Sequence, residues 1–277
     1  MLFFLKSRKN LWKGLFLISI ALFSLQLQAE GFTHQPEAKS DEQREVKLSQ
    51  ELIRLFFNVN AEISNDELQA YVDELEAFTQ KLAKRQYKYR SEKQFLRYAF
   101  YKIHNRYMKH YSEHTDLYDL VENGNYDCIT GSAFYALILD ALDIKYVIRE
   151  LPYHVFLLVE IEDESSVVLF ESTDARNGFI TDAGAIKEMM STYEEDIQPA
   201  SDVYYNYSFT INEKIELKQL AALNYYNEAI AHYNQQNLKE AEYYLNYARQ
   251  LYPAKRMEAL HYLINQVSNQ SAAQMGR

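Results

Sequence analysis

The stretch from Ile129 to Leu142 is apolar on nearly all sides, and it constrains the fold more than any other part of the sequence. A helix without a polar face has no surface to turn to water, so this one must be buried inside a domain. Its small residues, Gly131, Ala133 and Ala136, allow a neighbouring sheet to approach closely. The sequence therefore predicts a core helix packed against a sheet.

Three segments that follow this helix are rich in β-branched and aromatic residues and are separated by polar breaks. They span 146–149, 153–161 and 167–170. Such short runs with turn residues between them are typical of neighbouring strands. We expect them to form an antiparallel sheet.

The segments before the core helix have a helical period. Apolar residues recur at helical spacing in 48–59, in 68–82 behind Ser64, and in 95–107 behind Ser91. Serine is a favoured residue immediately before a helix, because its hydroxyl accepts a hydrogen bond from a free backbone amide. Together with the strands, these helices indicate an α+β fold.

The helical pattern returns in residues 213–277. Within it, aromatic, small and apolar residues are spaced as in one tetratricopeptide repeat between Ala222 and Lys255, so this part resembles that repeat family. The positions that carry the resemblance are Tyr225, Ala229, Tyr233, Leu238, Ala241, Leu245, Ala248 and Pro253. A single repeat cannot bury its own apolar face, so we expect this module to dock on the rest of the chain or on a protein partner.

The first residues have the three parts of a secretory signal. A basic start is followed by an apolar run and by Ala29, where we expect cleavage. Residues 1–29 are then the signal, residues 30–44 a polar linker, and residues 45–212 the main domain ahead of the helical module. The signal predicts export to the periplasm or the extracellular space. An uncleaved segment that anchors the protein is the alternative.

The charge of the chain excludes one class of partner. Cleavage removes four of the 29 basic residues and no acidic residue, which leaves 25 against 39 and a net charge of −14. A domain this acidic repels phosphate backbones, and the sequence contains no compact basic stripe. Binding to nucleic acid is therefore not expected.

Cys128 is the only cysteine, and it falls at the first position of the core helix. Free backbone amides and the helix dipole at that position stabilise a thiolate, which is the form that attacks carbonyl carbon. Asp127, as the residue before the helix, should point its carboxylate at the helix amides. The Cys128 amide is the predicted oxyanion donor, and Asn125 is a candidate for the second donor.

A thiol nucleophile needs a base, and His154 opens the second predicted strand. The base in turn needs an acceptor that orients it, and the next strand offers Glu171 and Asp174. A two-residue hairpin loop pairs Phe156 with Glu171 and places Glu171 on the same face as His154. An odd-length loop would favour Asp174 instead.

The order of these residues resembles the transglutaminase-like superfamily, within the wider papain-like architecture. The resemblance covers roughly residues 120–174 and rests on three strings: Tyr126-Asp127-Cys128-Ile129-Thr130-Gly131-Ser132, His154-Val155-Phe156 and Phe170-Glu171-Ser172-Thr173. At the last of these the family commonly has an Asp-Pro-Thr string, for which this chain has Glu-Ser-Thr.

The resemblance implies acyl transfer at an amide bond. Cys128 would be the nucleophile, His154 the base and Glu171 the residue that orients the base. A protease-like or amidase-like hydrolysis through a thioester follows, with a peptide or protein amide as substrate, cell-wall peptide included. The resemblance implies no cofactor. It does not imply calcium-dependent cross-linking, because the sequence has no calcium-loop pattern.

Two other interpretations were weighed. A chain that keeps this fold without activity could act as a scaffold that binds protein partners at the cell envelope through its repeat module. His110 and His114 are four residues apart, with Glu113 and Asp116 near them, and could share a metal. No third ligand is evident from the spacing, so we expect a solvated polar segment and no metal site.

Overall fold

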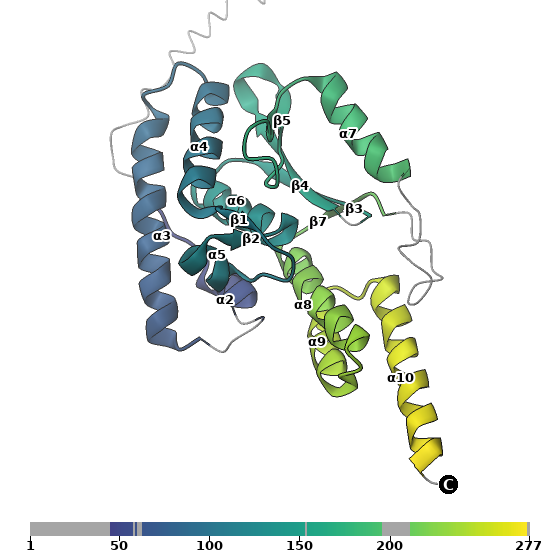
Figure 1. The fold of residues 1–277 in the computed structure, drawn as a ribbon. Helices are drawn as coiled ribbons and strands as arrows, with labels where there is room; N and C mark the ends of the chain where they lie inside the picture. Colours follow the sequence, from purple (N-terminus) through teal and green to yellow (C-terminus); the bar gives the residue numbers. More distant parts are fainter. Residues whose placement is uncertain (1–44, 58, 60–62, 153, 196–210, 276–277) are drawn as a thin grey trace, which may run out of the picture. The chain divides into compact units, whose positions relative to one another are not determined.

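Figure 1 shows the protein as a computed structural model. The structure describes residues 45–57, 59, 63–152, 154–195 and 211–275. The predicted signal (1–29) and linker (30–44) lie outside the described residues. None of the helices that the structure describes has an apolar stretch long enough to cross a bilayer.

The first third of the described chain is helical, as predicted. Its helices are α2 (Gln50–Phe57), α3 (Asn65–Gln86) and α4 (Glu92–Tyr107). The hydroxyl of Ser64 accepts a hydrogen bond from the Glu67 amide while the Glu67 side chain returns one to Ser64, which confirms the predicted start of α3. Ser91 accepts from the Gln94 amide in the same way and begins α4.

A short connection leads from α4 to the core helix. It contains β1 (His110–Tyr111), α5 (Leu117–Asn123) and β2 (Asn125–Tyr126), and β1 pairs with β2 in parallel. None of these three elements was predicted, because two-residue strands and a two-turn helix are too short to produce a period.

The predicted core helix is α6 (Cys128–Ala141). Every residue in it is buried except Cys128, which is half-buried, and Asp140, which is exposed. The hydroxyl of Tyr135, which has no exposed surface, donates to the backbone carbonyl of Phe100 at 3.1 Å. The helix is therefore surrounded by protein, as its sequence requires.

Five antiparallel strands form one sheet beside α6, which places the fold in the α+β class. They are β3 (Tyr146–Leu151), β4 (His154–Ile161), β5 (Ser166–Phe170), β6 (Phe179–Ile180) and β7 (Glu213–Ile215), in the order β6-β5-β4-β3-β7. The prediction that residues from 213 onward are helical was wrong at β7. Three residues are too few to show a period, and their partner β3 lies more than 60 residues earlier in the chain.

The hairpin between β4 and β5 has the predicted register. Leu157 pairs with Phe170, and Ile161 pairs with Ser166. The turn differs in detail, because a 3₁₀ turn at Glu162–Glu164 and a left-handed Ser165 replace the last predicted pair. The alternation of faces along both strands is nevertheless the one expected.

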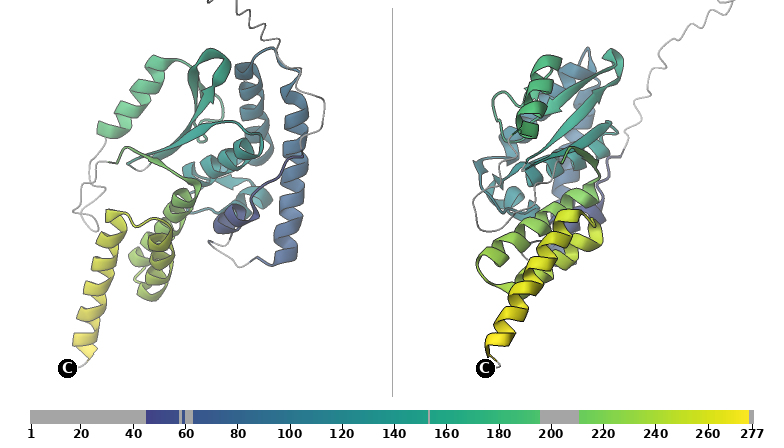
Figure 2. Two further views of the ribbon diagram at one scale, coloured as in Figure 1. Left: turned by 180° about the vertical axis from the view of Figure 1, so that it is seen from behind. Right: turned by 90° about the vertical axis from the view of Figure 1, so that its right-hand side faces the viewer.

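The two faces of the sheet are covered by different helices (Figure 1, Figure 2). Val155, Leu157 and Val159 of β4 belong to the main core, which includes α6. On the opposite face, Phe156 joins a smaller cluster with Ile186 of α7 (Ala183–Glu195). The sequence did not predict α7, which lies against β3.

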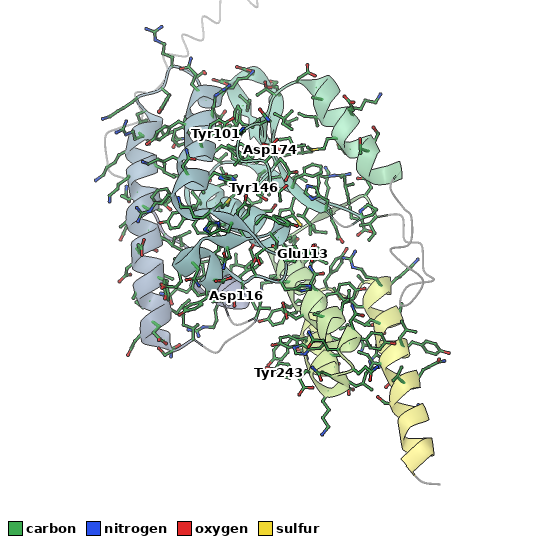
Figure 3. All side chains as sticks on the ribbon, viewed as in Figure 1. Tyr101, Glu113, Asp116, Tyr146, Asp174 and Tyr243 are labelled. Carbon is green, nitrogen blue, oxygen red and sulfur yellow. The ribbon has the colours of Figure 1, made fainter. Side chains whose placement is uncertain are left out.

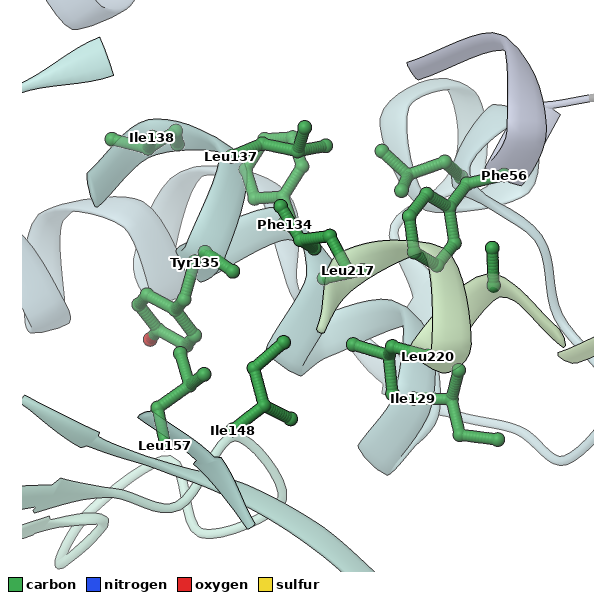
Figure 4. Close-up of a cluster of buried hydrophobic side chains, with 14 of the residues drawn as sticks. Phe56, Ile129, Phe134, Tyr135, Leu137, Ile138, Ile148, Leu157, Leu217 and Leu220 are labelled. Atoms are coloured by element: carbon green, nitrogen blue, oxygen red, sulfur yellow. The ribbon is translucent and has the colours of Figure 1, made fainter. Parts of the chain in front are cut away.

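The chain ends in three helices that share the main core. They are α8 (Leu217–Asn234), α9 (Leu238–Leu251) and α10 (Lys255–Met275). Figure 4 shows Leu217 and Leu220 of α8 beside Phe134 of α6 and Phe56 of α2, within one buried cluster. Of the two alternatives expected for the repeat-like module, the structure shows docking on the rest of the chain.

Replacing Leu220 with alanine tests this shared core. Leu220 has no exposed surface, so the cavity should lower the free energy of unfolding by about 2–5 kcal/mol. We expect one cooperative transition in urea, because α8 and α6 lose the same contacts. Tyr262→Ala, at a side chain that is 55% exposed on α10, is the control and should change stability by less than about 0.5 kcal/mol. A separate early transition of α8–α10 in Leu220→Ala would contradict a shared core.

Candidate active site

The first turn of α6 lies where β4 and β5 separate. Their ladder ends at the pair of Leu157 with Phe170, so the start of β4 continues without that neighbour. The backbone of Val155 forms hydrogen bonds with two side chains of α6 instead. The Ser132 hydroxyl donates to the Val155 carbonyl at 3.3 Å, and the Val155 backbone forms a hydrogen bond with the Cys128 sulfur. The helix start is thus fixed to the strand residue that follows His154.

The other side of this turn touches the segment that follows β5. A Cβ at Gly131 would lie 2.7 Å from the Cβ of Ser172, closer than real Cβ atoms approach. The glycine is therefore required by the space between α6 and Ser172. Because Ser172 comes directly after Glu171, this contact sets the position of the candidate acidic residue.

Asp127 begins α6 as predicted. Its Oδ1 accepts hydrogen bonds from the Thr130 amide at 2.8 Å and from the Thr130 hydroxyl at 2.9 Å. The Asp127 amide donates to that same hydroxyl oxygen at 2.9 Å. A further bond, 3.1 Å long, joins Thr130 to the hydroxyl of Thr115 in the loop before α5. The carboxylate points at the helix amides and leaves the Cys128 amide outside this network.

Cys128 is half-buried, and the prediction that its position lowers the thiol pKa was wrong for the resting protein. Burial raises the pKa of Cys128 to about 12, and the charge of the Asp127 carboxylate adds to that effect. The hydrogen bond with the Val155 backbone lowers the thiol pKa, and the charge of Glu171 raises it. At neutral pH the sulfur therefore carries its proton.

His154 and Glu171 form a buried pair. The distance from His154 Nε2 to Glu171 Oε2 is 2.5 Å, and the two residues are 7% and 3% exposed. The other carboxylate oxygen, Oε1, accepts from the Thr173 amide at 3.0 Å and from the Thr173 hydroxyl at 2.6 Å. A proton on Nε2 donates to the carboxylate, which makes Nδ1 the basic nitrogen of the neutral ring. The pair therefore fixes both the orientation and the tautomer of the imidazole.

Of the two acidic candidates, the structure brings Glu171 to His154 and gives Asp174 another partner. Asp174 is labelled in Figure 3. Its Oδ1 accepts from the amides of Arg176 and Asn177 at 2.9 and 2.8 Å, which closes the turn after β5. Burial of Asp174 opposes ionisation, but these hydrogen bonds outweigh it and lower its pKa. Asp174 thus stabilises a turn.

The candidate oxyanion donors differ in their surroundings. The Asn125 side-chain amide donates to both carboxylate oxygens of Asp119, at 3.1 and 3.0 Å. It would have to leave Asp119 to serve as a donor, so its role stays a prediction. The Cys128 amide is at the first position of α6, where no earlier turn of the helix supplies an acceptor.

Sequence reasoning missed His104, which holds the segment after β5. This histidine on α4 is 3% exposed, and its Nε2 lies 3.0 Å from the carbonyl oxygen of Ser172. Its ring packs edge-on against Tyr126 at 5.5 Å, and burial lowers its pKa. The only signal in the sequence is its place on the apolar face of α4, one turn after Phe100, where a polar residue needs a buried partner.

The two histidines weighed as metal ligands are not assembled into a cluster. Among the residues described, no group of three or more histidine, cysteine, aspartate or glutamate side chains could hold a metal ion. His114 instead lies 3.7 Å from Glu228 of α8. Comparisons of the chain with protein-family models, with curated proteins and with solved structures find no match.

Gly131→Ala tests the close contact between α6 and Ser172. The added methyl group must displace either segment, which should lower the free energy of unfolding by about 1–3 kcal/mol. Gly184→Ala in α7 is the matched control, because the added methyl group would meet only the end of the Asp182 side chain, at 3.1 Å, and alanine favours a helix. Urea unfolding measures both. Equal stability of Gly131→Ala and wild type would contradict the contact.

Asp127→Asn tests the electrostatic account of the thiol. Asparagine also begins helices well, so the cap is kept while the negative charge is removed. Because that charge raises the thiol pKa, the pKa of Cys128 should fall and its alkylation by iodoacetamide at pH 8 should become faster. Mass spectrometry across pH measures this, with the exposed Asp66→Asn in α3 as control. A thiol pKa that is unchanged or higher in Asp127→Asn would refute the account.

Proposed function

We propose that this chain is an exported cysteine enzyme with a transglutaminase-like core, which hydrolyses amide bonds of peptides or proteins through a thioester. The observation that carries the proposal is the buried pair of His154 and Glu171, one residue from the backbone that binds the Cys128 sulfur. A thiol nucleophile needs a base that a third group orients, and the pair of His154 with Glu171 supplies an oriented base.

In the proposed acylation, sulfur attack and proton transfer occur together. Since the Cys128 thiol is protonated at neutral pH, His154 Nδ1 takes its proton as the S–C bond to the amide carbonyl forms. The carbonyl oxygen becomes an oxyanion, which the Cys128 amide can stabilise. Glu171 stabilises the imidazolium through Nε2.

The remaining steps return the enzyme to its starting state. The C–N bond breaks, and His154 gives its proton to the departing amine, which leaves a thioester on Cys128. A water molecule then attacks the thioester while His154 takes one of its protons. The S–C bond breaks, the acid product leaves, and the proton returns to the sulfur. His154 acts first as base and then as acid in each half of the cycle.

Two features of the described residues favour a second candidate, a scaffold that binds protein partners at the cell envelope. The raised pKa of Cys128 disfavours an unassisted thiolate, and α9 exposes the aromatic side chains of Tyr243 and Tyr247. The scaffold does not require His154 to affect the sulfur. The two candidates therefore differ in whether the reactivity of the Cys128 sulfur depends on His154.

Acylation by p-nitrophenyl acetate tests the proposal without a known substrate. Intact-mass spectrometry follows the acetyl group on Cys128, and we expect His154→Ala to slow acylation by about 100-fold or more, because general-base assistance is lost. Glu171→Gln should slow it less, since the base remains but is less well oriented. His110→Ala, at an exposed histidine of β1, is the control and should match the wild type. Equal acylation rates in the wild type and His154→Ala would favour the scaffold.

A further inference from the structure

A row of polar side chains follows one face of α8. Asn224, Glu228 and His232 are one helical turn apart, so they lie one above the other. Helical side chains tilt toward the N-terminus of their helix, which directs the Glu228 carboxylate over Asn224. Asn224 has no exposed surface and Glu228 is 8% exposed, although this helix is otherwise part of the main core.

The loop that leads to α5 connects this row to the candidate active site. His114 in that loop lies 3.7 Å from Glu228, and the next residue, Thr115, is hydrogen-bonded to Thr130 in the first turn of α6. Asp116, which begins α5, is 2% exposed and is close enough to raise the pKa of Glu228 by its charge. The Asp127 carboxylate, next to Cys128, acts on Glu228 in the same direction. The row therefore lies near the start of α6.

A tyrosine ring from α9 packs on the outer end of the row, and a second tyrosine packs on the first. Tyr244 stacks on His232 with ring centroids 5.2 Å apart, and its pKa is raised first by burial and then by the charge of Glu228. Tyr243 contacts Tyr244 edge-on at 5.4 Å and is 56% exposed. The site thus has a carboxylate at its base and aromatic faces at its rim, which is the chemistry that binds organic cations.

All three side chains of the row have buried polar atoms that lack hydrogen bonds within the described part of the chain, His232 through its Nδ1. Among the described residues, neither the oxygen nor the nitrogen of the Asn224 side-chain amide has a partner, and Glu228 Oε1 has none either. Buried polar atoms are almost always paired with protein, water or a ligand, so the unpaired oxygens of Asn224 and Glu228 are acceptors that a bound donor could fill. The contact of His114 with Glu228, at 3.7 Å, is too long for a hydrogen bond, and the His114 side chain is 43% exposed. An incoming group can therefore displace the imidazole.

We propose that Asn224, Glu228 and Tyr244 form a subsite for the primary ammonium group of a lysine-type side chain in the peptide substrate. An ammonium group has three donors and fits separate acceptors on Glu228 and Asn224, whereas a guanidinium group prefers two oxygens of one carboxylate. The subsite rests on the proposed function for its role, because it selects peptides for cleavage at Cys128. In this proposal the repeat-like module contributes to binding of the peptide substrate.

The electrostatics of Glu228 are consistent with a cation site. Burial raises the pKa of Glu228, His114 and His232 lower it, and Asp116 and Asp127 raise it. The net shift is upward, so the groups that face Glu228 do not compensate the cost of burying its charge. A bound ammonium group would supply that compensation.

Binding of blocked tripeptides to the full-length Cys128→Ala protein tests the subsite. This variant cannot form a thioester, so the result does not depend on whether the proposed hydrolysis is correct. Isothermal titration calorimetry compares acetyl-Gly-Lys-Gly-amide with its norleucine counterpart, which has a similar shape and no charge. We expect the lysine peptide to bind about tenfold more tightly, as a charged hydrogen bond to Glu228 would give.

Substitutions in the Cys128→Ala protein test which residues cause the preference for the lysine peptide. Glu228→Gln, added to Cys128→Ala, keeps the shape of the side chain and should remove the preference for lysine. Glu240→Gln, at an exposed acidic residue of α9, should keep it. Tyr244→Leu should weaken binding of the lysine peptide about threefold, through loss of the cation–π contact. Circular dichroism checks the fold of each variant. Equal affinities of the two peptides, or a lysine preference that survives in folded Glu228→Gln, would overturn the inference.

Discussion

The close contact between the first turn of α6 and the separated ends of β4 and β5 is the constraint on which the rest of the site depends. Val155 no longer has a β5 neighbour, yet its backbone groups are buried and need partners. Cys128 and Ser132, one turn apart on α6, supply them. The hydrogen-bonding requirement of a strand end thus determines where the cysteine lies. Gly131 allows the approach by omitting a side chain.

The same burial that fixes the site also suppresses the charge of the sulfur. A helix start favours a thiolate, but at Cys128 the loss of solvent and the nearby Asp127 carboxylate dominate. A neutral thiol is less readily oxidised than a thiolate, and in the proposed reaction it would need a base at the moment of attack. The buried pair of His154 and Glu171 suits that role, because the carboxylate stabilises the imidazolium only when the proton arrives.

Local patterns predicted the parts of the site that depend on neighbouring residues. The all-round apolar sequence of α6, the position of Asp127 and the face shared by His154 and Glu171 follow from helix burial, capping and strand alternation. Contacts between distant segments had no such signal. His104 reaches Ser172 across 68 residues, and the thiol pKa results from burial that periodicity does not measure. The strand β7 was missed for the same reason, since its partner is β3.

The central claim is that Glu171 fixes His154 with its proton on Nε2 and its Nδ1 basic. Nitrogen-15 NMR of the histidine-labelled protein tests it most directly, with the His154 signals assigned by their absence in His154→Ala. The account predicts that the neutral ring carries its proton on Nε2 and none on Nδ1, and that the neutral ring of Glu171→Gln is a mixture of tautomers. A proton on Nδ1 in the wild type, or the same spectrum in Glu171→Gln, would contradict it.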